Sequence, residues 1–225
     1  MLKANECGKT FDNFTAPFCT NAKYIFLVGS GITYAAYKSH RSQTEELQID
    51  ISSDQPLGEF SEVGEILGWG GLSALYMLYQ GSRGWIYKED RAYENAELAL
   101  EATVYTSLAT LLAKTLIQKS RPDGSDNNSF PSGHTSSSFA WASVVMARHD
   151  WYYGLGAYLV SSYVAFSRIN DDRHHFYDVY GGITLGASYA WGIYFNHQNY
   201  GKDFWVTALP TEKLDGASLN VTYRF

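Results

Sequence analysis

The stretch FPSGHTSSSFA, residues 130–140, places a proline, a serine, a glycine and a histidine directly before an apolar run with helical spacing. Ser132 fits an N-cap, since its hydroxyl can accept from the free backbone N–H groups of a first helical turn. Gly133 lets another group approach the backbone closely. Helix N-termini of this kind bind anions, most often phosphate. The stretch therefore predicts a phosphate cradle with His134 at its edge; the alternative is a capped helix with a surface histidine.

Two cations precede this stretch. Lys114 lies seven residues before Arg121, which is followed by Pro122. Seven residues are two helical turns, so the two side chains can share a helix face and point to one place. Cations are also favoured at any helix C-terminus, which is the simpler interpretation.

A third group follows in SRINDDRHHFYD, residues 167–178. His174 and Asp178 are four residues apart, a spacing that puts both on one helix face. A carboxylate there can accept from one ring nitrogen and leave the other with a basic lone pair. Arg168 adds another cation. An ordinary surface His–Asp pair has the same spacing, and His175 lies only three residues before Asp178.

Together the three stretches, K-x6-RP, PSGH and SR-x5-H-x3-D, resemble the signature of the type 2 phosphatidic acid phosphatase superfamily. That superfamily also holds class A acid phosphatases, lipid phosphate phosphatases and vanadium haloperoxidases. The resemblance covers roughly residues 91–195. It implies an all-α bundle and a metal-independent phosphatase that hydrolyses phosphomonoesters or diphosphates, with a phosphorylated lipid as the expected substrate. No cofactor is expected. A vanadate-dependent haloperoxidase and a non-enzymatic phosphate-binding envelope protein are the alternatives.

The resemblance implies a role for each residue of the signature. His174 would attack phosphorus and carry a phosphohistidine, with Asp178 orienting its ring. His134 would protonate the leaving oxygen as the general acid. Preorganised donors are the main catalytic device in such a transfer, so fixed cations make a divalent metal unnecessary. The phosphate-binding residues would be Lys114, Arg121, Ser132, Gly133 and Arg168.

One local feature departs from the pattern that is common in this superfamily. Asp171 and Asp172 place two acids directly before Arg173 and His174, where a glycine or a neutral residue is common. Carboxylates close to the reacting phosphate would disfavour substrates with additional negative charge. The alternative is that both acids point to solvent or pair with Arg173.

The remaining sequence supplies the elements that position these residues. We expect a bundle of about five to six helices in residues 23–198, an irregular leader in residues 1–22 and a small β-hairpin in the tail, residues 199–225. The tail prediction depends on ASLNVTYRF, which alternates apolar and polar side chains with period two. A strand-like LQIDI interrupts the polar stretch 39–55. The helices are expected at 24–37, 61–81, 91–120, 132–147, 152–168 and from 174 or 177 to 195.

Composition narrows the class of partner. A net charge of -6 over 225 residues gives no basic surface for nucleic acid. Aromatic side chains make up 16% of the chain, which suits a thick core or a membrane interface. The mean hydropathy of -0.24 is low for a mostly transmembrane chain. We expect a membrane-associated enzyme of the bacterial envelope whose site faces the periplasm, with a soluble periplasmic enzyme as the alternative. Cys7 and Cys19 form either a disulfide or two free thiols.

Overall fold

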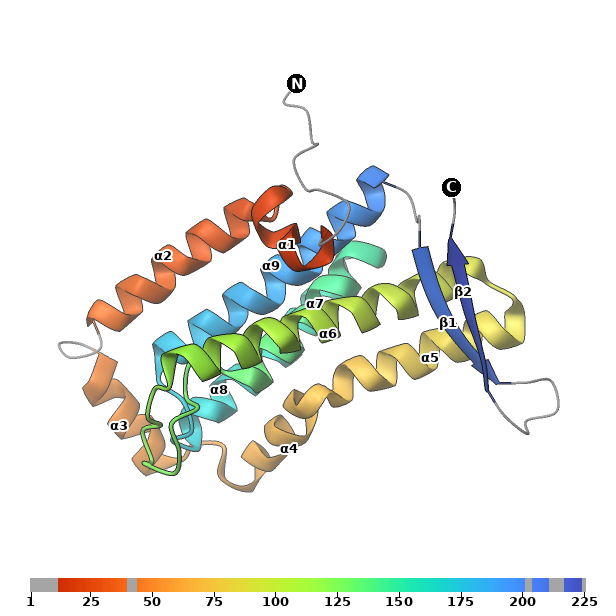
Figure 1. The fold of residues 1–225 in the computed structure, drawn as a ribbon. Coiled ribbons are helices and arrows are strands. Elements are labelled where there is room, and N and C mark those ends of the chain that lie inside the picture. The colour runs from red at the N-terminus through yellow and green to blue at the C-terminus, as the bar shows by residue number, and fades with distance from the viewer. Residues whose placement is uncertain (1–11, 40–43, 201–203, 211–216, 224–225) are drawn as a thin grey trace.

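The computed structural model describes residues 12–39, 44–200, 204–210 and 217–223, and its helices form one bundle (Figure 1). This confirms the all-α class, with shorter and more numerous helices in the N-terminal third than the sequence predicts. The helices are α1 (Asp12–Cys19), α2 (Lys23–Ser39), α3 (Glu45–Asp54), η2 (Gly58–Phe60), α4 (Ser61–Ile66), η3 (Leu67–Gly71), α5 (Leu72–Tyr87), α6 (Asp90–Ile117), α7 (Gly133–Arg148), α8 (Trp151–Asn170) and α9 (Phe176–Tyr200).

Two predictions for the N-terminal part are wrong. Residues 12–19, expected in an irregular leader, form α1, and Ala16 is fully buried where α1 packs against α9. The strand-like LQIDI lies inside α3, where Glu45 and Glu46 in the first turn suit a helix N-terminus. A five-residue apolar alternation cannot override this preference without a neighbouring strand. Cys7, and with it the disulfide alternative, lies outside the described residues.

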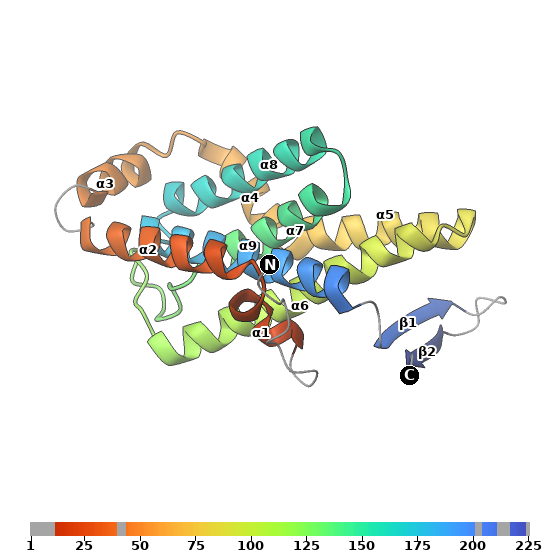
Figure 2. The ribbon, with the colours of Figure 1, turned by 90° about the horizontal axis from the view of Figure 1, so that it is seen from above.

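The C-terminal segment, for which the sequence predicts a hairpin, holds strands β1 (Phe204–Pro210) and β2 (Ala217–Tyr223). The strands pair antiparallel, with Phe204 opposite Tyr223 and Pro210 opposite Ala217. Figure 2 shows that they follow α9 and lie apart from the helices that carry the signature residues.

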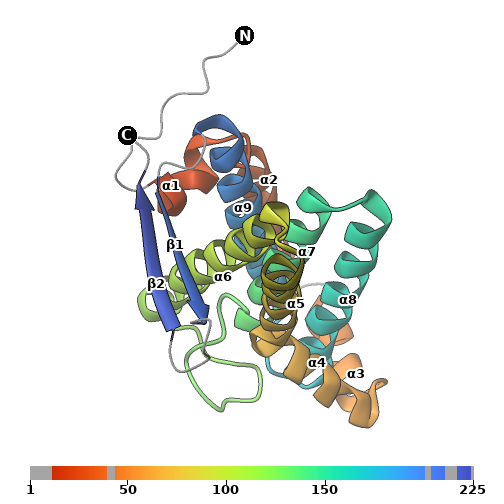
Figure 3. The same cartoon turned by 90° about the vertical axis from the view of Figure 1, so that its right-hand side faces the viewer.

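Helix α7 is the centre of the bundle and packs against α6, α8 and α9, as the view along the bundle shows (Figure 3). A glycine permits the close approach of α9: a Cβ added to Gly186 would lie 2.3 Å from the carbonyl oxygen of Ser136. The core beside this contact is built from Leu98, Val144 and Ile193, each at most 1% exposed. Burial of this apolar surface fixes the position of α7 relative to its neighbours.

One end of the bundle gathers the ends of the elements that carry the signature. Helix α6 ends at Ile117, because Gln118 takes a left-handed backbone conformation (φ 48°) and its N–H caps the carbonyl of Lys114. Helix α7 begins after its N-cap Ser132. The loop between them folds back across the end of the bundle, where α8 also ends and α9 begins (Figure 1).

A bend separates α4 from α5. The sequence predicts one helix over residues 61–81 that is loosened by its glycines, and the structure shows that these glycines break it. Trp69 (ψ 15°) and Gly70 (φ 88°) leave the helical conformation, and the left-handed φ favours glycine. We call Leu67–Gly71 the kink segment. It packs against α7 close to His134.

Candidate active site

A pocket of about 360 Å³ lies at this end of the bundle, between α6, α7 and the kink segment. Ser132, Arg168 and Asp178 do not line it and are buried around it. The other predicted site residues all line its wall: Lys114, Arg121, Gly133, His134 and His174.

The first turn of α7 forms one side of the pocket. Ser132 is its N-cap, as predicted, and the Ser132 hydroxyl accepts from the backbone N–H and the hydroxyl of Thr135 at 3.4 and 3.0 Å. A Cβ added to Gly133 would have only Lys114 Cε and Thr110 Cγ2 nearby, both at 3.9 Å. The Lys114 side chain therefore lies beside the N-terminus of α7, and Gly133 leaves room between them. A cation facing free N–H groups is an arrangement suited to an anion.

Lys114 and Arg121 meet in this pocket for a reason other than the predicted one. Because α6 ends at Ile117, Arg121 cannot share a helix face with Lys114. It lies on the returning loop, where its Nε donates to Asp126 Oδ1 at 2.8 Å. Lys114 Nζ donates to the carbonyl oxygen of Asn128 in the same loop. Burial, followed by repulsion from Arg121, lowers the pKa of Lys114 to about 8.

His174 is 2% exposed and precedes α9, so the predicted shared helix face with Asp178 is also wrong. The turn before the helix nevertheless brings the two side chains together, with His174 Nδ1 3.9 Å from Asp178 Oδ2. That distance is longer than a hydrogen bond. On the other side of the ring, Nε2 lies 3.4 Å from Arg121 Nη1. Burial and the charges of Arg121 and Lys114 hold the pKa of His174 well below its usual value, so the ring is neutral at pH 7.

Asp178 is fully buried, and its hydrogen bonds hold the start of α9 in place. Its Oδ2 accepts from Ser129 Oγ at 2.6 Å and from the His175 backbone N–H at 2.9 Å. The second contact is the return bond of a capping box. The Asp178 carbonyl also accepts from the Ser132 N–H at 2.9 Å, which ties the start of α9 to the start of α7. Burial raises the pKa of Asp178 to about 6.

His134 lies in the first turn of α7 under the kink segment. Its buried Nε2 has no hydrogen-bond partner among the described residues. Burial, followed by the charge of Arg168, lowers its pKa to about 4. The indole of Trp69 meets the ring edge-on, with centroids 5.7 Å apart, and a Cβ added to Gly68 would lie 2.6 Å from His134 Cβ. The kink segment therefore covers His134, a role that the glycine-rich sequence at 68–71 could have suggested.

Arg168 is 2% exposed and is held by four oxygens. Two come from α4, which the sequence did not link to the site: the Ser61 carbonyl accepts at 3.2 Å, and Glu65 Oε2 lies at 3.5 Å. The others are Ser167 Oγ at 3.1 Å and Asp171 Oδ2 at 2.9 Å. Buried cations require such partners. The acidic residues in the apolar stretch 61–71 were the available signal.

The two acids that depart from the family pattern thus have different surroundings. Asp171 forms an ion pair with Arg168. Both alternatives predicted for it, a side chain that faces solvent and a pair with Arg173, are therefore wrong. Arg173 pairs instead with Asp123 at 2.9 Å. Asp172 adopts a left-handed backbone conformation, φ 53°. Only Asp171 is therefore connected to the cluster of cations.

We expect Asp171→Asn to lower the free energy of unfolding by about 1–3 kcal/mol, because Arg168 would lose its nearest counter-charge while remaining buried. Thermal unfolding in detergent measures this. Asp172→Asn is the matched control and should have little effect, since asparagine tolerates a positive φ at least as well as aspartate. Saturating inorganic phosphate should stabilise the Asp171→Asn variant more than the wild type. Equal unfolding temperatures for both variants would contradict the assigned anchor.

A family comparison concerns the part of the chain that carries the signature. The model of the PAP2 superfamily matches residues 102–202, which run from the middle of α6 past the end of α9. This part of the chain belongs to the PAP2 superfamily. The PAP2 region thus contains every predicted site residue, whereas α4 and the kink segment lie upstream of it.

One curated relative and two solved structures are similar to parts of this chain. A stretch of 70 residues is 41% identical to the lipid A 1-phosphatase of Porphyromonas gingivalis; it covers 29% of this chain and 16% of that protein. The crystal structure of LpxE from Aquifex aeolicus aligns with a TM-score of 0.54 and 20% identity, covering 69% of this chain and 96% of that one. The transmembrane PAP2-type phosphatidylglycerolphosphate phosphatase of Bacillus subtilis aligns with a TM-score of 0.57 and 18% identity, covering 86% and 99%.

Proposed function

We propose that this protein is a metal-independent phosphatase that hydrolyses a phosphomonoester or diphosphate of a lipid through a phosphohistidine on His174. The observation that carries the proposal is that two neutral histidines and two cations line the same pocket. His134 and His174 both line the pocket, and Lys114 and Arg121 supply positive charge beside them. Such a set can bind a phosphate, attack it and protonate what leaves.

In the first step, Nε2 of His174 attacks phosphorus and forms the N–P bond as the P–O bond to the lipid breaks. This nitrogen is assigned because it lies on the Arg121 side of the ring, whereas Nδ1 lies towards Asp178. A small rotation of the ring would bring Nδ1–H into hydrogen-bond distance of the Asp178 carboxylate. Lys114, Arg121, the α7 N-terminus and the Ser132–Gly133 turn stabilise charge on the phosphoryl oxygens, and Arg168 adds positive charge from behind the pocket wall.

His134 supplies the proton that the leaving oxygen takes up. Burial and neighbouring cations disfavour its imidazolium and lower its pKa to about 4. The negative charge of a bound phosphate dianion favours the imidazolium and raises the pKa of His134. Substrate binding therefore promotes the protonation that His134 needs to act as an acid. In the second step, His134 accepts a proton from water as the water oxygen attacks phosphorus. The N–P bond then breaks and inorganic phosphate leaves.

A lipid substrate is supported by the surface of the bundle. Large apolar side chains are exposed on several helices, and extended exposed apolar surface marks a membrane or protein interaction site. No helix within the described ranges has an apolar stretch long enough to cross a bilayer. We propose association with the membrane of a bacterial envelope, with the pocket on the periplasmic side. Exposed examples on α2, α5 and α6 are Leu27, Val28, Leu75, Leu78, Leu108, Leu111 and Leu116, each at least 50% exposed.

Release of phosphate from a lipid phosphate in mixed micelles tests the proposal. We expect turnover that EDTA does not reduce and that orthovanadate inhibits below millimolar concentration, since vanadate adopts the five-coordinate geometry of the transfer. Turnover that EDTA abolishes and magnesium restores would refute the metal-independent mechanism. Bromide oxidation by vanadate and peroxide, without phosphate release, would indicate the haloperoxidase alternative. Phosphate binding without either reaction would indicate a binding protein.

The lowered pKa of Lys114 predicts the alkaline limb of the pH profile. The ammonium is fully charged well below pH 8 and is lost as the pH rises through about 8, so phosphate binding weakens there. We expect kcat/KM, which reports ionisations of the free enzyme, to fall above about pH 8. In Lys114→Arg the charge persists, because a guanidinium stays protonated in this range. The alkaline limb should therefore move to higher pH, even if the maximum rate is lower. An unchanged limb would assign it to another group.

A further inference from the structure

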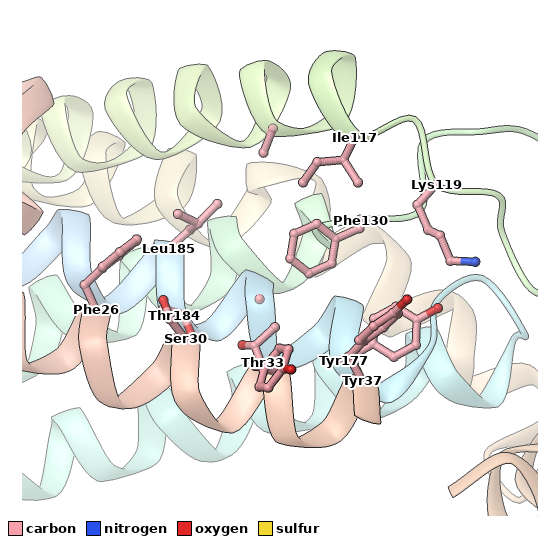
Figure 4. A pocket seen from close by; sticks show the side chains of 13 residues that line it. Phe26, Ser30, Thr33, Tyr37, Ile117, Lys119, Phe130, Tyr177, Thr184 and Leu185 are labelled. Carbon is pink, nitrogen blue, oxygen red and sulfur yellow. The ribbon is translucent and has the colours of Figure 1, made fainter. Parts of the chain in front are cut away.

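A second pocket, of about 440 Å³, lies between α2, α6 and α9 (Figure 4). We call it the α2 groove. Its walls are apolar, and Phe26, Ile117, Phe130 and Leu185 supply much of the lining. Figure 4 shows the Phe130 ring against α9, where a Cβ added to Gly181 would lie 2.6 Å from the ring. The Phe130 ring and α9 therefore close one side of the groove.

The α2 groove is separate from the catalytic pocket. The two pockets share no lining residue. The segment Phe130–Pro131 lies between them: the Phe130 ring lines the groove, while the next residues, Ser132 and Gly133, start the phosphate cradle. Tyr177 likewise lines the groove while its neighbour Asp178 belongs to the catalytic cluster. An occupant of the groove would pack against the back of the catalytic elements without meeting the reacting phosphate.

One end of the α2 groove carries a positive charge. Lys119 is the single charged side chain among the described residues that line it, and Figure 4 shows it at the end near Tyr37 and Tyr177. None of the described acidic side chains forms an ion pair with Lys119. The Asp178 carboxyl feels the charge of Lys119 without forming an ion pair with it. An apolar channel with this cation at its end is complementary to an apolar chain with an anionic head.

The size of the α2 groove limits the class of molecule that can bind in it. A three-turn helix about 10 Å across fills roughly 1200 Å³, which is too large for the groove. An acyl chain is slender enough to enter. The α2 helix, which forms one wall of the groove, also exposes Leu27 and Val28 at 63% and 65%, so this helix presents apolar side chains on the surface that we place against lipid.

We propose that the α2 groove binds one acyl chain of an anionic membrane phospholipid that is not the substrate, with the lipid head group at Lys119. The site goes beyond the proposed function and does not depend on turnover. A chain that enters the groove leaves other acyl chains and not water, so the groove contributes packing contacts and the head group supplies the preference for an anionic lipid. One lysine beside an anionic head group contributes about fivefold.

Photochemical labelling of the full chain in phosphatidylcholine vesicles tests the site. The probe is a trace of phosphatidylglycerol with a diazirine in one acyl chain; it has no terminal phosphate, so a phosphomonoesterase does not consume it. We expect label on the groove peptides of α2 and α9. Ser30→Phe fills the groove and should reduce that label more than tenfold, because the ring occupies the space that the chain would take. Ile32→Phe, on the same helix but outside the groove, should leave the label unchanged.

A separate experiment tests whether Lys119 binds the lipid head group. Lys119→Gln should reduce labelling by the phosphatidylglycerol probe about fivefold and leave a phosphatidylcholine probe unaffected. Lys23→Gln, at the other end of α2, is the matched control. Ala113→Phe blocks the groove from the α6 wall and replaces Ser30→Phe if that variant does not fold. Label spread evenly over the apolar faces of α5 and α8, or groove label that survives both blocking variants, would overturn the proposal.

Discussion

His174→Ala is expected to reduce turnover by about 10⁴-fold or more, because no other described nucleophile has the same position between the cations and Asp178. Quenching with alkaline detergent during turnover of a substrate with labelled phosphate should trap the label on the wild-type chain and not on this variant. The trapped bond should be acid-labile and alkali-stable, as expected for a phosphoramidate.

The matched control for this experiment is His175→Ala. His175 stacks on Tyr177, with centroids 4.9 Å apart, and does not line the catalytic pocket. It should therefore retain the phosphoenzyme and most of the turnover. Label that persists on His174→Ala and disappears from His175→Ala would reverse the assignment of the nucleophile.

His134→Ala should slow hydrolysis of a lipid phosphate by about 10²–10⁴-fold, because an alkoxide leaving group needs the proton that His134 supplies. p-Nitrophenyl phosphate needs little protonation, so its first step should be far less affected. The variant should then release a burst of nitrophenol and accumulate phosphohistidine, since water activation in the second step is also impaired.

Rapid-mixing measurements of both substrates with each enzyme provide an internal control. The ratio of their first-step rates should change between wild type and His134→Ala, whatever fraction of the protein is active. An equal loss on both substrates would mean that His134 acts mainly by binding the phosphate or by shaping the pocket.

The sequence predicts the core of this site better than the way it is assembled. The N-cap at Ser132 follows from a hydroxyl before a helical apolar run, which is a local property. The helix faces proposed for Lys114 with Arg121, and for His174 with Asp178, are wrong, since Arg121 and His174 lie in loops beyond the helix ends. A left-handed C-cap at Gln118 leaves little trace in the sequence, so the helix end was placed too late.

The contacts of Arg168 with Glu65 and of His134 with Trp69 could not be predicted from residue spacing. Glu65 and Trp69 are about 100 and 65 residues away from the side chains that they contact. Their contribution depends on the bend at Gly70, which sets the direction in which the kink segment meets α7. Spacing within one helix predicts neighbours within a few turns, whereas contacts between distant segments depend on the packing of the whole bundle.

The upstream position of α4 and the kink segment affects where the smallest functional unit of this protein can begin. A chain trimmed to residues 102–202 would keep both histidines and the three cations. It would lose the Ser61 and Glu65 oxygens that hold Arg168 and the Trp69 cover over His134. A piece of the chain that keeps these contacts therefore begins no later than Ser61, and transplanting the candidate site requires α4 and the kink segment in addition to the PAP2 region.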